Sequence, residues 1–390
     1  MAKSGKSLLL WLAIAIVAGV AIGVCAPACV IRTLNSFGAT FGQFIKFIVP
    51  FIIVALVTPA IAEAGRSAGR MLLLTMCLAY ASTLLAGTFA FGVAKAVFPT
   101  FIDGALDSSV AAKEFSPYFK LAIPPIMSLT TAMATAFMFG LVLAARPCET
   151  LSRVFVEMKE VVSTTIARAV VPLLPFYILT VIADLTASGR LLAVGGSCLK
   201  IMGSALAVTT AILLAQYVIA GAVARRNPFK ALWTMLPAYL TGWGCCSSAA
   251  TIPVTLRQVR QNGVSDETAN LVVPLCANIH LAGSMANMVI YGAGFVVLAG
   301  GTLGIGPFAE YIFMISILAV ASPGVPGGVV LASAPVAEAA LGITPEHYAV
   351  LIAVYMALDG MGTAGNLTGD GAIAMIVDRF RTGGKEGSQR

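Results

Sequence analysis

Charged residues are scarce in this sequence: only 11% of its 390 residues are Asp, Glu, Lys or Arg. A soluble domain carries about a quarter, and hydrophobic residues make up 59% of this chain. Such a chain cannot cover itself with a surface compatible with water, so we predict an all-α protein that crosses a bilayer repeatedly. A spanning helix needs roughly 20 mostly apolar residues. We place eight such runs at 7–30, 41–64, 71–98, 124–145, 170–185, 199–223, 269–298 and 348–377.

The motifs of nucleotide-binding and metal enzymes are also missing. The sequence has no P-loop, no H-E-x-x-H and no C-x-x-C, and Ser247-Ser248 lacks the G-x-S-x-G context of a hydrolase nucleophile. Most of the eight cysteines lie inside apolar runs, where cysteine behaves as a small hydrophobic residue. We therefore expect no enzyme activity and no bound cofactor. Any energy-requiring process must draw on an ion gradient.

The formal net charge of +7 reflects Lys and Arg concentrated at the ends of the apolar runs. This distribution follows the positive-inside rule and does not indicate a nucleic-acid partner. With eight crossings and both termini in the cytoplasm, these basic groups can all be cytoplasmic. We predict a multi-pass protein of the inner (plasma) membrane. Although Lys3 and Lys6 precede the first run as in a signal peptide, its length favours a retained helix.

From residue 231 onwards, two apolar stretches are interrupted by polar or glycine- and proline-rich sequence. Stretch 231–262 is split at 242–248 and is basic at both ends, which predicts a re-entrant hairpin entering from the cytoplasm with a serine tip. Stretch 305–343 is split at 322–328 and has no Lys or Arg, which favours a hairpin entering from outside. Paired broken segments indicate a transporter site built from an inverted repeat. The alternative is that both clusters are loops between shorter spans.

From these observations we predict three parts of the chain. Residues 1–230 form six transmembrane helices, residues 231–380 form a transport core, and residues 381–390 form a cytoplasmic tail. The transport core consists, in order, of hairpin 231–262, a helix at 266–300, hairpin 305–343 and a helix at 346–379.

The last span carries four polar side chains on one face. Asp359, Thr363, Asn366 and Asp370 are spaced by four, three and four residues, so they line up along a helix of 3.6 residues per turn. A carboxylate at the centre of a spanning helix costs about 2.5–3.5 kcal/mol on insertion scales, so such groups normally face a cavity and bind something. The alternative is that they are acids near the end of a shorter span.

The preceding span is interrupted at Asn278–Ser284. Asn and His followed by Gly can unwind a helix and expose carbonyl oxygens, which suit a hard cation such as sodium. His280 is one of only two histidines. A buried histidine with a purely structural hydrogen bond is the alternative to a functional one.

No Lys or Arg occurs between Arg260 and Arg379. An acidic side chain entering this part of the molecule would lack the bidentate partner that carboxylates usually find. An amino group, in contrast, would find Asp359. An α-carboxylate could be held by Asn366 and by helix N-termini at the hairpin tips. The chemistry therefore favours a zwitterion with a neutral side chain.

Five segments together resemble the signatures of the dicarboxylate/amino acid:cation symporter (glutamate transporter) family, in order and at similar spacing. They are FIKFIVP at 44–50, SSAATIPVT at 247–255, PLCANIHLAGS at 274–284, GVPG at 324–327 and NLTGD at 366–370. The resemblance covers most of the chain. It implies a homotrimer with elevator-type alternating access. The first, second, fourth and fifth spans would form a scaffold, and the third and sixth would join the hairpins and last two spans in a moving transport domain.

The resemblance also implies two sets of site residues. The solute would be bound by the hairpin tips and the last two spans, at Ser247, Ser248, Ser284, Gly324, Val325, Asp359, Gly362, Thr363 and Asn366. Sodium ions would be bound by side chains or carbonyls of Cys276, Asn278, His280, Leu281, Ala319, Val320, Ser322, Asn366 and Asp370.

Departures from the family pattern bear on the solute and on the coupling ion. Acidic-substrate members place an arginine where this chain has Gly362, and some carry one where it has Cys246. The family motif Asn-Met-Asp-Gly-Thr is replaced by His280–Ser284, which puts two of the family's sodium sites in doubt, although Ser82 and Thr83 keep a hydroxyl pair.

We therefore predict sodium-coupled symport of a small neutral amino acid by an elevator mechanism. Proton-coupled symport through His280, of an amino acid or another small organic solute, is the alternative. A channel would need a polar stripe through several spans, and an intramembrane enzyme using Ser247 or Cys246 would need a base that the sequence does not offer.

Overall fold

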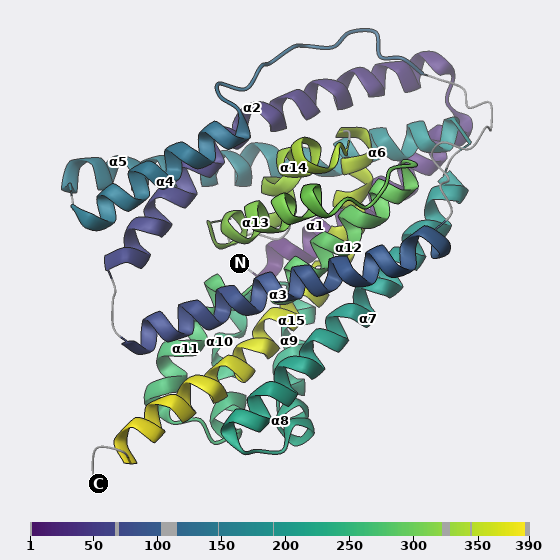
Figure 1. Ribbon diagram of the computed structural model, residues 1–390. Coiled ribbons are helices and arrows are strands. Elements are labelled where there is room, and N and C mark those ends of the chain that lie inside the picture. Colours follow the sequence, from purple (N-terminus) through teal and green to yellow (C-terminus); the bar gives the residue numbers. More distant parts are fainter. Residues whose placement is uncertain are drawn as a thin grey trace.

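The computed structural model describes residues 2–66, 70–102, 115–146, 148–189, 191–321, 328–343 and 345–386. Within these ranges every regular element is a helix, as predicted. The first half of the chain contains α1 to α7 (Figure 1). Their bounds are α1 Ala2–Cys25, α2 Ala28–Arg66, α3 Arg70–Phe101, α4 Leu129–Ala145, α5 Glu149–Thr165, a π-helical turn at Ile166–Val170, α6 Val171–Ala187 and α7 Leu191–Ala224.

The second half contains shorter helices and ends in one long helix. Their bounds are α8 Pro228–Thr234, α9 Leu236–Cys245, α10 Ser248–Gln261, α11 Asp266–Ile279, α12 Ala282–Leu298, α13 Ile305–Ala321, α14 Gly328–Leu341 and α15 Pro345–Glu386. In Figure 1, α15 runs beside α3 and α7. It also packs against α9 and α10 of the first interrupted stretch and against α11 and α12.

Several local details differ from the prediction. The run predicted at 7–30 is not a single helix, because α1 ends at Cys25 and α2 begins at Ala28. The run predicted at 124–145 is wrong at its start, because α4 begins only at Leu129, where the Ser128 hydroxyl caps it by accepting a hydrogen bond from the Thr131 amide. Helix α5 was not predicted, because its sequence is charged. It is amphipathic and buries Phe155 and Val162 on one face.

The helices sort into two packing groups. In one group, α1 packs along α6, and α2 packs along α4, α5 and α6. Gly23 allows the close approach of α1 to α6, because a Cβ there would overlap Thr186 and lie 2.6 Å from the Ala183 carbonyl oxygen. In the other group, α3 and α7 pack against α12 and α15. Contacts between the groups come mainly from α13 and α14 against α2 and from α15 against α6.

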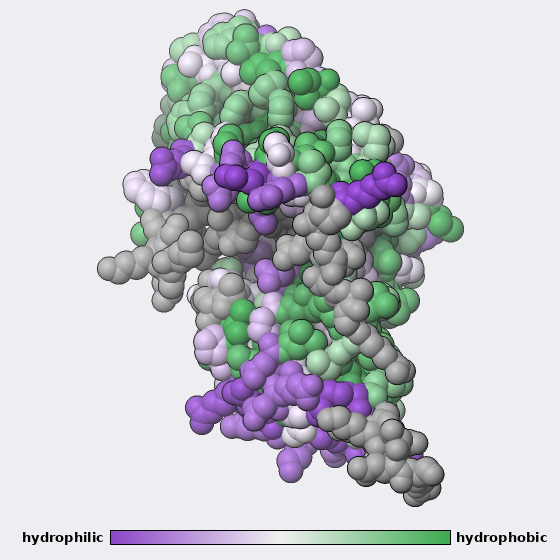
Figure 2. Space-filling view, turned by 90° about the vertical axis from the view of Figure 1, so that its left-hand side faces the viewer, coloured by the Kyte–Doolittle hydropathy of each residue, from purple (hydrophilic) through white to green (hydrophobic). Residues whose placement is uncertain are grey.

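Three helical stretches in the described ranges are long and apolar enough to cross a membrane: Met71–Phe101, Gly195–Ala224 and Asp266–Leu298. The bent pair Glu149–Val170 and Pro172–Ala187 makes a fourth if it is counted as one span. Eight crossings therefore stay a prediction. Figure 2 shows hydrophobic surface over much of one face, with hydrophilic residues gathered at the lower end and in a band higher up.

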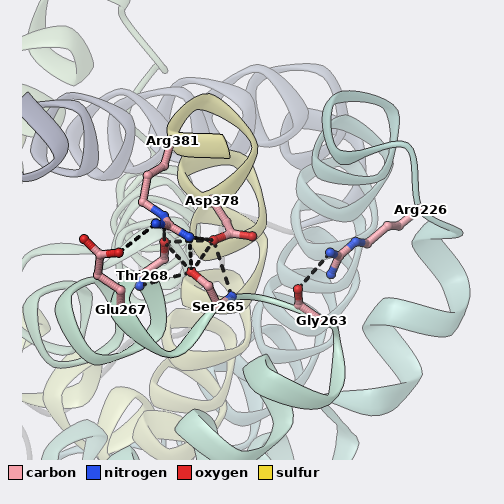
Figure 3. Close-up of polar contacts among 7 residues, drawn as sticks. All are labelled: Arg226, Gly263, Ser265, Glu267, Thr268, Asp378 and Arg381. Carbon is pink, nitrogen blue, oxygen red and sulfur yellow. Dashed lines mark hydrogen bonds and ion pairs between the residues drawn. The ribbon is translucent and has the colours of Figure 1, made fainter. Parts of the chain in front are cut away.

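A polar cluster ties the start of α11 to the end of α15 (Figure 3). The Ser265 and Thr268 hydroxyls donate to Asp378 Oδ1 at 2.6 and 2.8 Å. Arg381 donates to Ser265 Oγ at 2.8 Å and pairs with Glu267 at 2.7 Å. Burial opposes ionisation of Asp378, but these hydroxyl hydrogen bonds outweigh it and hold the pKa of Asp378 below its usual value. The cluster fixes the position of α11 along α15.

The loop before this cluster turns at Gly263, whose φ of 79° lies in the left-handed region. The Arg226 guanidinium donates to the Gly263 carbonyl oxygen at 2.8 Å, which joins the end of α7 to the same loop (Figure 3). Any Cβ at position 263 would lie 2.6 Å from this guanidinium. Glycine is therefore favoured here by the backbone conformation, whereas a larger residue would also displace the end of the Arg226 side chain.

Candidate functional site

The span predicted at 266–300 is broken between α11 and α12, at the predicted interruption. His280 has extended backbone angles (φ −98°, ψ 105°), and α12 restarts at Ala282. The break frees the Leu281 amide from the helix, and the Thr83 hydroxyl of α3 accepts its hydrogen bond at 3.2 Å. The buried backbone amide that the break leaves without a helical partner is thus hydrogen-bonded by a side chain of a neighbouring helix.

His280 and Asp370 form a buried pair beside this break. Imidazole Nδ1 lies 2.9 Å from Asp370 Oδ1, and the two side chains are 0% and 1% exposed. On the other side of the ring, Ser82 Oγ lies 3.1 Å from Nε2 and accepts a hydrogen bond from the Gln216 amide at 2.8 Å. When the imidazole is neutral and carries its proton on Nδ1, these contacts form one chain of hydrogen bonds. Gln216 donates to Ser82, Ser82 donates to Nε2, and Nδ1–H donates to the carboxylate.

The side chain of Cys276, one turn before the break, is also buried. The structure therefore pairs His280 with Asp370 and places Cys276 on the turn before the break. Carboxylate, hydroxyl and exposed carbonyl oxygens are ligands suited to a hard cation. The described residues contain no group of three or more His, Cys, Asp or Glu side chains placed to hold a metal ion.

A second polar cluster lies one turn along α15, between α12 and α15. The Ser284 amide donates to Asn366 Oδ1 at 3.0 Å, and Asn366 Nδ2 donates to Ser284 Oγ at 2.9 Å. The Tyr355 hydroxyl makes side-chain hydrogen bonds with Asp359 and Ser284. Asp359 is 8% exposed, so both carboxylates of the predicted polar face, Asp359 and Asp370, are buried inside the protein.

Glycines allow the backbones to approach closely here. A Cβ at Gly283 would lie 2.7 Å from the Gly362 carbonyl oxygen, and one at Gly362 would lie 3.1 Å from both Ser284 Oγ and Asn287 Nδ2. The predicted solute residues Ser284, Gly362 and Asn366 are therefore neighbours. Thr363, on the same stretch of α15, is 7% exposed.

The tip of the first hairpin reaches α15 next to Asp359. Helix α9 ends at Cys246, which adopts the left-handed conformation (φ 50°, ψ 33°). A Cβ at Gly360 would overlap the Trp243 carbonyl and lie 3.1 Å from Cys246 Sγ. Ser247 and Ser248 follow at the start of α10, and both are half-buried. The structure thus places Trp243 and Cys246, just before these serines, against α15 one residue from Asp359.

Other predicted residues are placed elsewhere or cannot be placed. The Asn278 side chain is exposed and donates to the Pro274 carbonyl at 3.0 Å, so only its backbone could serve the site. Ala319 is buried on α13, and Val320 follows it on the same helix. Ser322, Gly324 and Val325 lie outside the described residues.

The sequence reasoning missed four polar residues at the site: Gln216, Asn287, Tyr291 and Tyr355. Gln216 is isolated in the apolar sequence of α7, and no pattern pointed to it. Asn287 and Tyr291 lie three and seven residues after Ser284, and Tyr355 lies four before Asp359. This helical spacing from predicted site residues was a usable signal.

Known proteins similar to this chain include amino acid transporters. The model of the sodium:dicarboxylate symporter family matches residues 8–380. Human neutral amino acid transporter B(0) is 25% identical over 157 residues, bovine neutral amino acid transporter A is 27% identical over 154, and human excitatory amino acid transporter 2 is 30% identical over 161. These alignments cover 39–40% of this chain but only 27–29% of the relatives.

Proposed function

The chain belongs to the sodium:dicarboxylate symporter family, and we propose that it carries out sodium-coupled symport of a small neutral amino acid. The observation that carries this proposal is the arrangement of Asp359 and Asp370. Both are buried on α15 and face the broken α11–α12 span, each with its own set of polar neighbours. One carboxylate would bind the amino group of the solute, and the other would bind the coupling ion.

The neutral solute follows from charges around the site rather than from the relatives. The relatives include both neutral and excitatory amino acid transporters, at similar identity. In this chain no Lys or Arg lies between Arg260 and Arg379, so position 362, which is glycine, supplies no charged side chain to the site. A second carboxylate entering beside Asp359 would be buried without a compensating cation, at a cost of several kcal/mol.

Sodium is the coupling ion that the family description names. The proposed ion positions combine Asp370 and Asn366 with backbone carbonyls near the break, including that of Leu281. Ser322, which lies outside the described residues, and Ala319 and Val320 of α13 would contribute carbonyls from the second hairpin. The buried His280–Asp370 pair favours one alternative, in which a proton replaces a sodium ion.

The two packing groups support an elevator mechanism. Helices α1, α2, α4, α5 and α6 would form the scaffold, whereas α3, α7 and the helices from α8 to α15 would form the moving domain. Contacts within each group are more extensive than those between the groups, which suits one body sliding against another. We further propose a homotrimer in the inner membrane, with cytoplasmic termini.

Counterflow of labelled alanine in sealed proteoliposomes tests this function. A carrier loaded with unlabelled alanine accumulates labelled alanine transiently, which neither a channel nor a hydrolase does. Varying sodium and pH independently then identifies the coupling ion. Accumulation driven by sodium at constant pH supports the proposal. Accumulation driven by a pH gradient without sodium would favour the proton-coupled alternative.

A further inference from the structure

Two buried polar groups on α12 have no hydrogen-bond partner in the described part of the chain. They are Asn287 Nδ2 and the Tyr291 hydroxyl, and both residues are 0% exposed. Buried donors without partners destabilise a protein, and they are rare in folded structures. Asn287 and Tyr291 are one turn apart, on the α12 face that carries Ser284. Two such groups in neighbouring positions indicate that a ligand satisfies them.

The direction of both groups is set by their neighbours. Asn287 Oδ1 accepts a hydrogen bond from the Thr209 hydroxyl of α7 at 3.1 Å, which turns Nδ2 toward α15. There Nδ2 lies next to Gly362, 3.1 Å from the point that the Cβ of any other residue at position 362 would occupy. The Tyr291 ring packs edge-on against Tyr355 of α15, with ring centroids 6.0 Å apart.

We propose that Asn287 and Tyr291 select solutes whose side chain carries a neutral oxygen, such as a hydroxyl or a carboxamide. The proposal rests on the proposed function, in which Asp359 binds the amino group. A solute held there would extend its side chain toward α12, where Nδ2 donates to the side-chain oxygen and the Tyr291 hydroxyl completes its hydrogen bonding. A carboxylate would instead be repelled by Asp359, and an aliphatic side chain would leave both groups unsatisfied.

Threonine and valine test this selection, because they differ only by a hydroxyl in place of a methyl group. The ratio of kcat/KM for threonine over valine is measured in proteoliposomes of the full chain under a sodium gradient. We expect the unmodified protein to favour threonine by about tenfold, the value of one well-formed hydrogen bond. In Asn287→Leu, which preserves the branched shape, the ratio falls toward one. In Tyr291→Phe it falls in part.

Tyr311→Phe is the matched control. Tyr311 is also fully buried, but its hydroxyl donates to the Met288 carbonyl oxygen. We expect Tyr311→Phe to lower the thermal stability of the solute-free protein and to leave the threonine/valine ratio unchanged. Tyr291→Phe should leave the thermal stability of the solute-free protein unchanged, because its hydroxyl has no partner to lose, and should lower the threonine/valine ratio. If Asn287→Leu fails to fold, Tyr291→Phe alone decides the matter.

The outcomes separate this inference from the function on which it rests. Transport of both amino acids without a preference for threonine, or a preference that survives both substitutions, overturns the selection and leaves neutral amino acid symport intact. If a folded protein transports neither threonine nor valine nor alanine, the proposed function fails and the selection fails with it.

Discussion

His280 Nδ1 lies 2.9 Å from Asp370 Oδ1, across the interface between the broken span and α15. The two residues are far apart in sequence, and the pair forms where α11 ends and its backbone becomes extended. The contact therefore joins the helix break to the last helix. It places a buried carboxylate beside freed backbone groups, the combination on which the proposed cation site depends.

Asp370→Asn should abolish sodium-driven uptake. The carboxylate is the charged ligand proposed for the ion, and an interaction with a charged group contributes about 1.5–3 kcal/mol, so we expect sodium affinity to fall about ten- to a hundredfold. Sodium binding to the purified protein, measured by calorimetry, checks this. Asp378→Asn is the matched control, because Asp378 lies on the same helix but bonds Ser265 and Thr268 outside the site. Equal loss in both variants would contradict a specific role for Asp370.

Asp359→Asn should weaken solute binding and leave sodium binding largely intact. A hydrogen bond to a charged group contributes about 1.5–3 kcal/mol, so alanine affinity should fall by roughly ten- to a hundredfold. Equilibrium binding of labelled alanine at saturating sodium measures the effect. Glu310→Gln, at an exposed acid on α13, should change neither affinity. Unchanged alanine affinity in Asp359→Asn would remove the basis for placing the amino group there.

Gly362→Arg should eliminate uptake of neutral amino acids. Any side chain at 362 meets Asn287 Nδ2 and Ser284 Oγ at 3.1 Å, and overpacking of this kind costs about 1–3 kcal/mol or more. In the double variant with Asn287→Ala, the arginine gains space, and we expect binding of aspartate to appear. Uptake of labelled alanine measures the first effect, and binding of labelled aspartate measures the second. Unimpaired neutral uptake in Gly362→Arg would show that the solute does not use this space.

Stability in detergent should fall in acid because of Asp378. Its pKa is lowered in the folded protein, so its contribution is present above the unfolded value, about pH 4, and is lost as pH falls through the folded value. Asp378→Asn should lower the melting temperature at neutral pH and reduce its dependence on acid pH. Thermal unfolding at neutral pH and near pH 3 measures this. An acid dependence equal to that of the unmodified protein would exclude Asp378 as its source.

The helices and the break at His280 could be predicted because their signals are local. Apolar length places the helices, and the Asn278–Ser284 sequence locates the unwound turn. The polar face of α15 could likewise be predicted from spacing alone. Helix α5 could not be found by apolar length, since it buries only a narrow face that includes Phe155 and Val162.

The partners of the predicted site residues could not be predicted, because they depend on packing between distant helices. Gln216 reaches His280 through Ser82 only because α7 and α3 meet at the break. Asn287 is turned toward Gly362 by Thr209 on another helix. No spacing rule within one helix contains that information.

The sodium dependence of alanine binding to the purified full chain tests the central claim most directly. If a sodium ion binds with the solute, the two binding events stabilise each other, and alanine affinity rises about tenfold per tenfold increase in sodium for each coupled ion below saturation. We predict this rise in the unmodified protein and its loss in Asp370→Asn. Alanine affinity that stays constant from zero to saturating sodium would contradict the account.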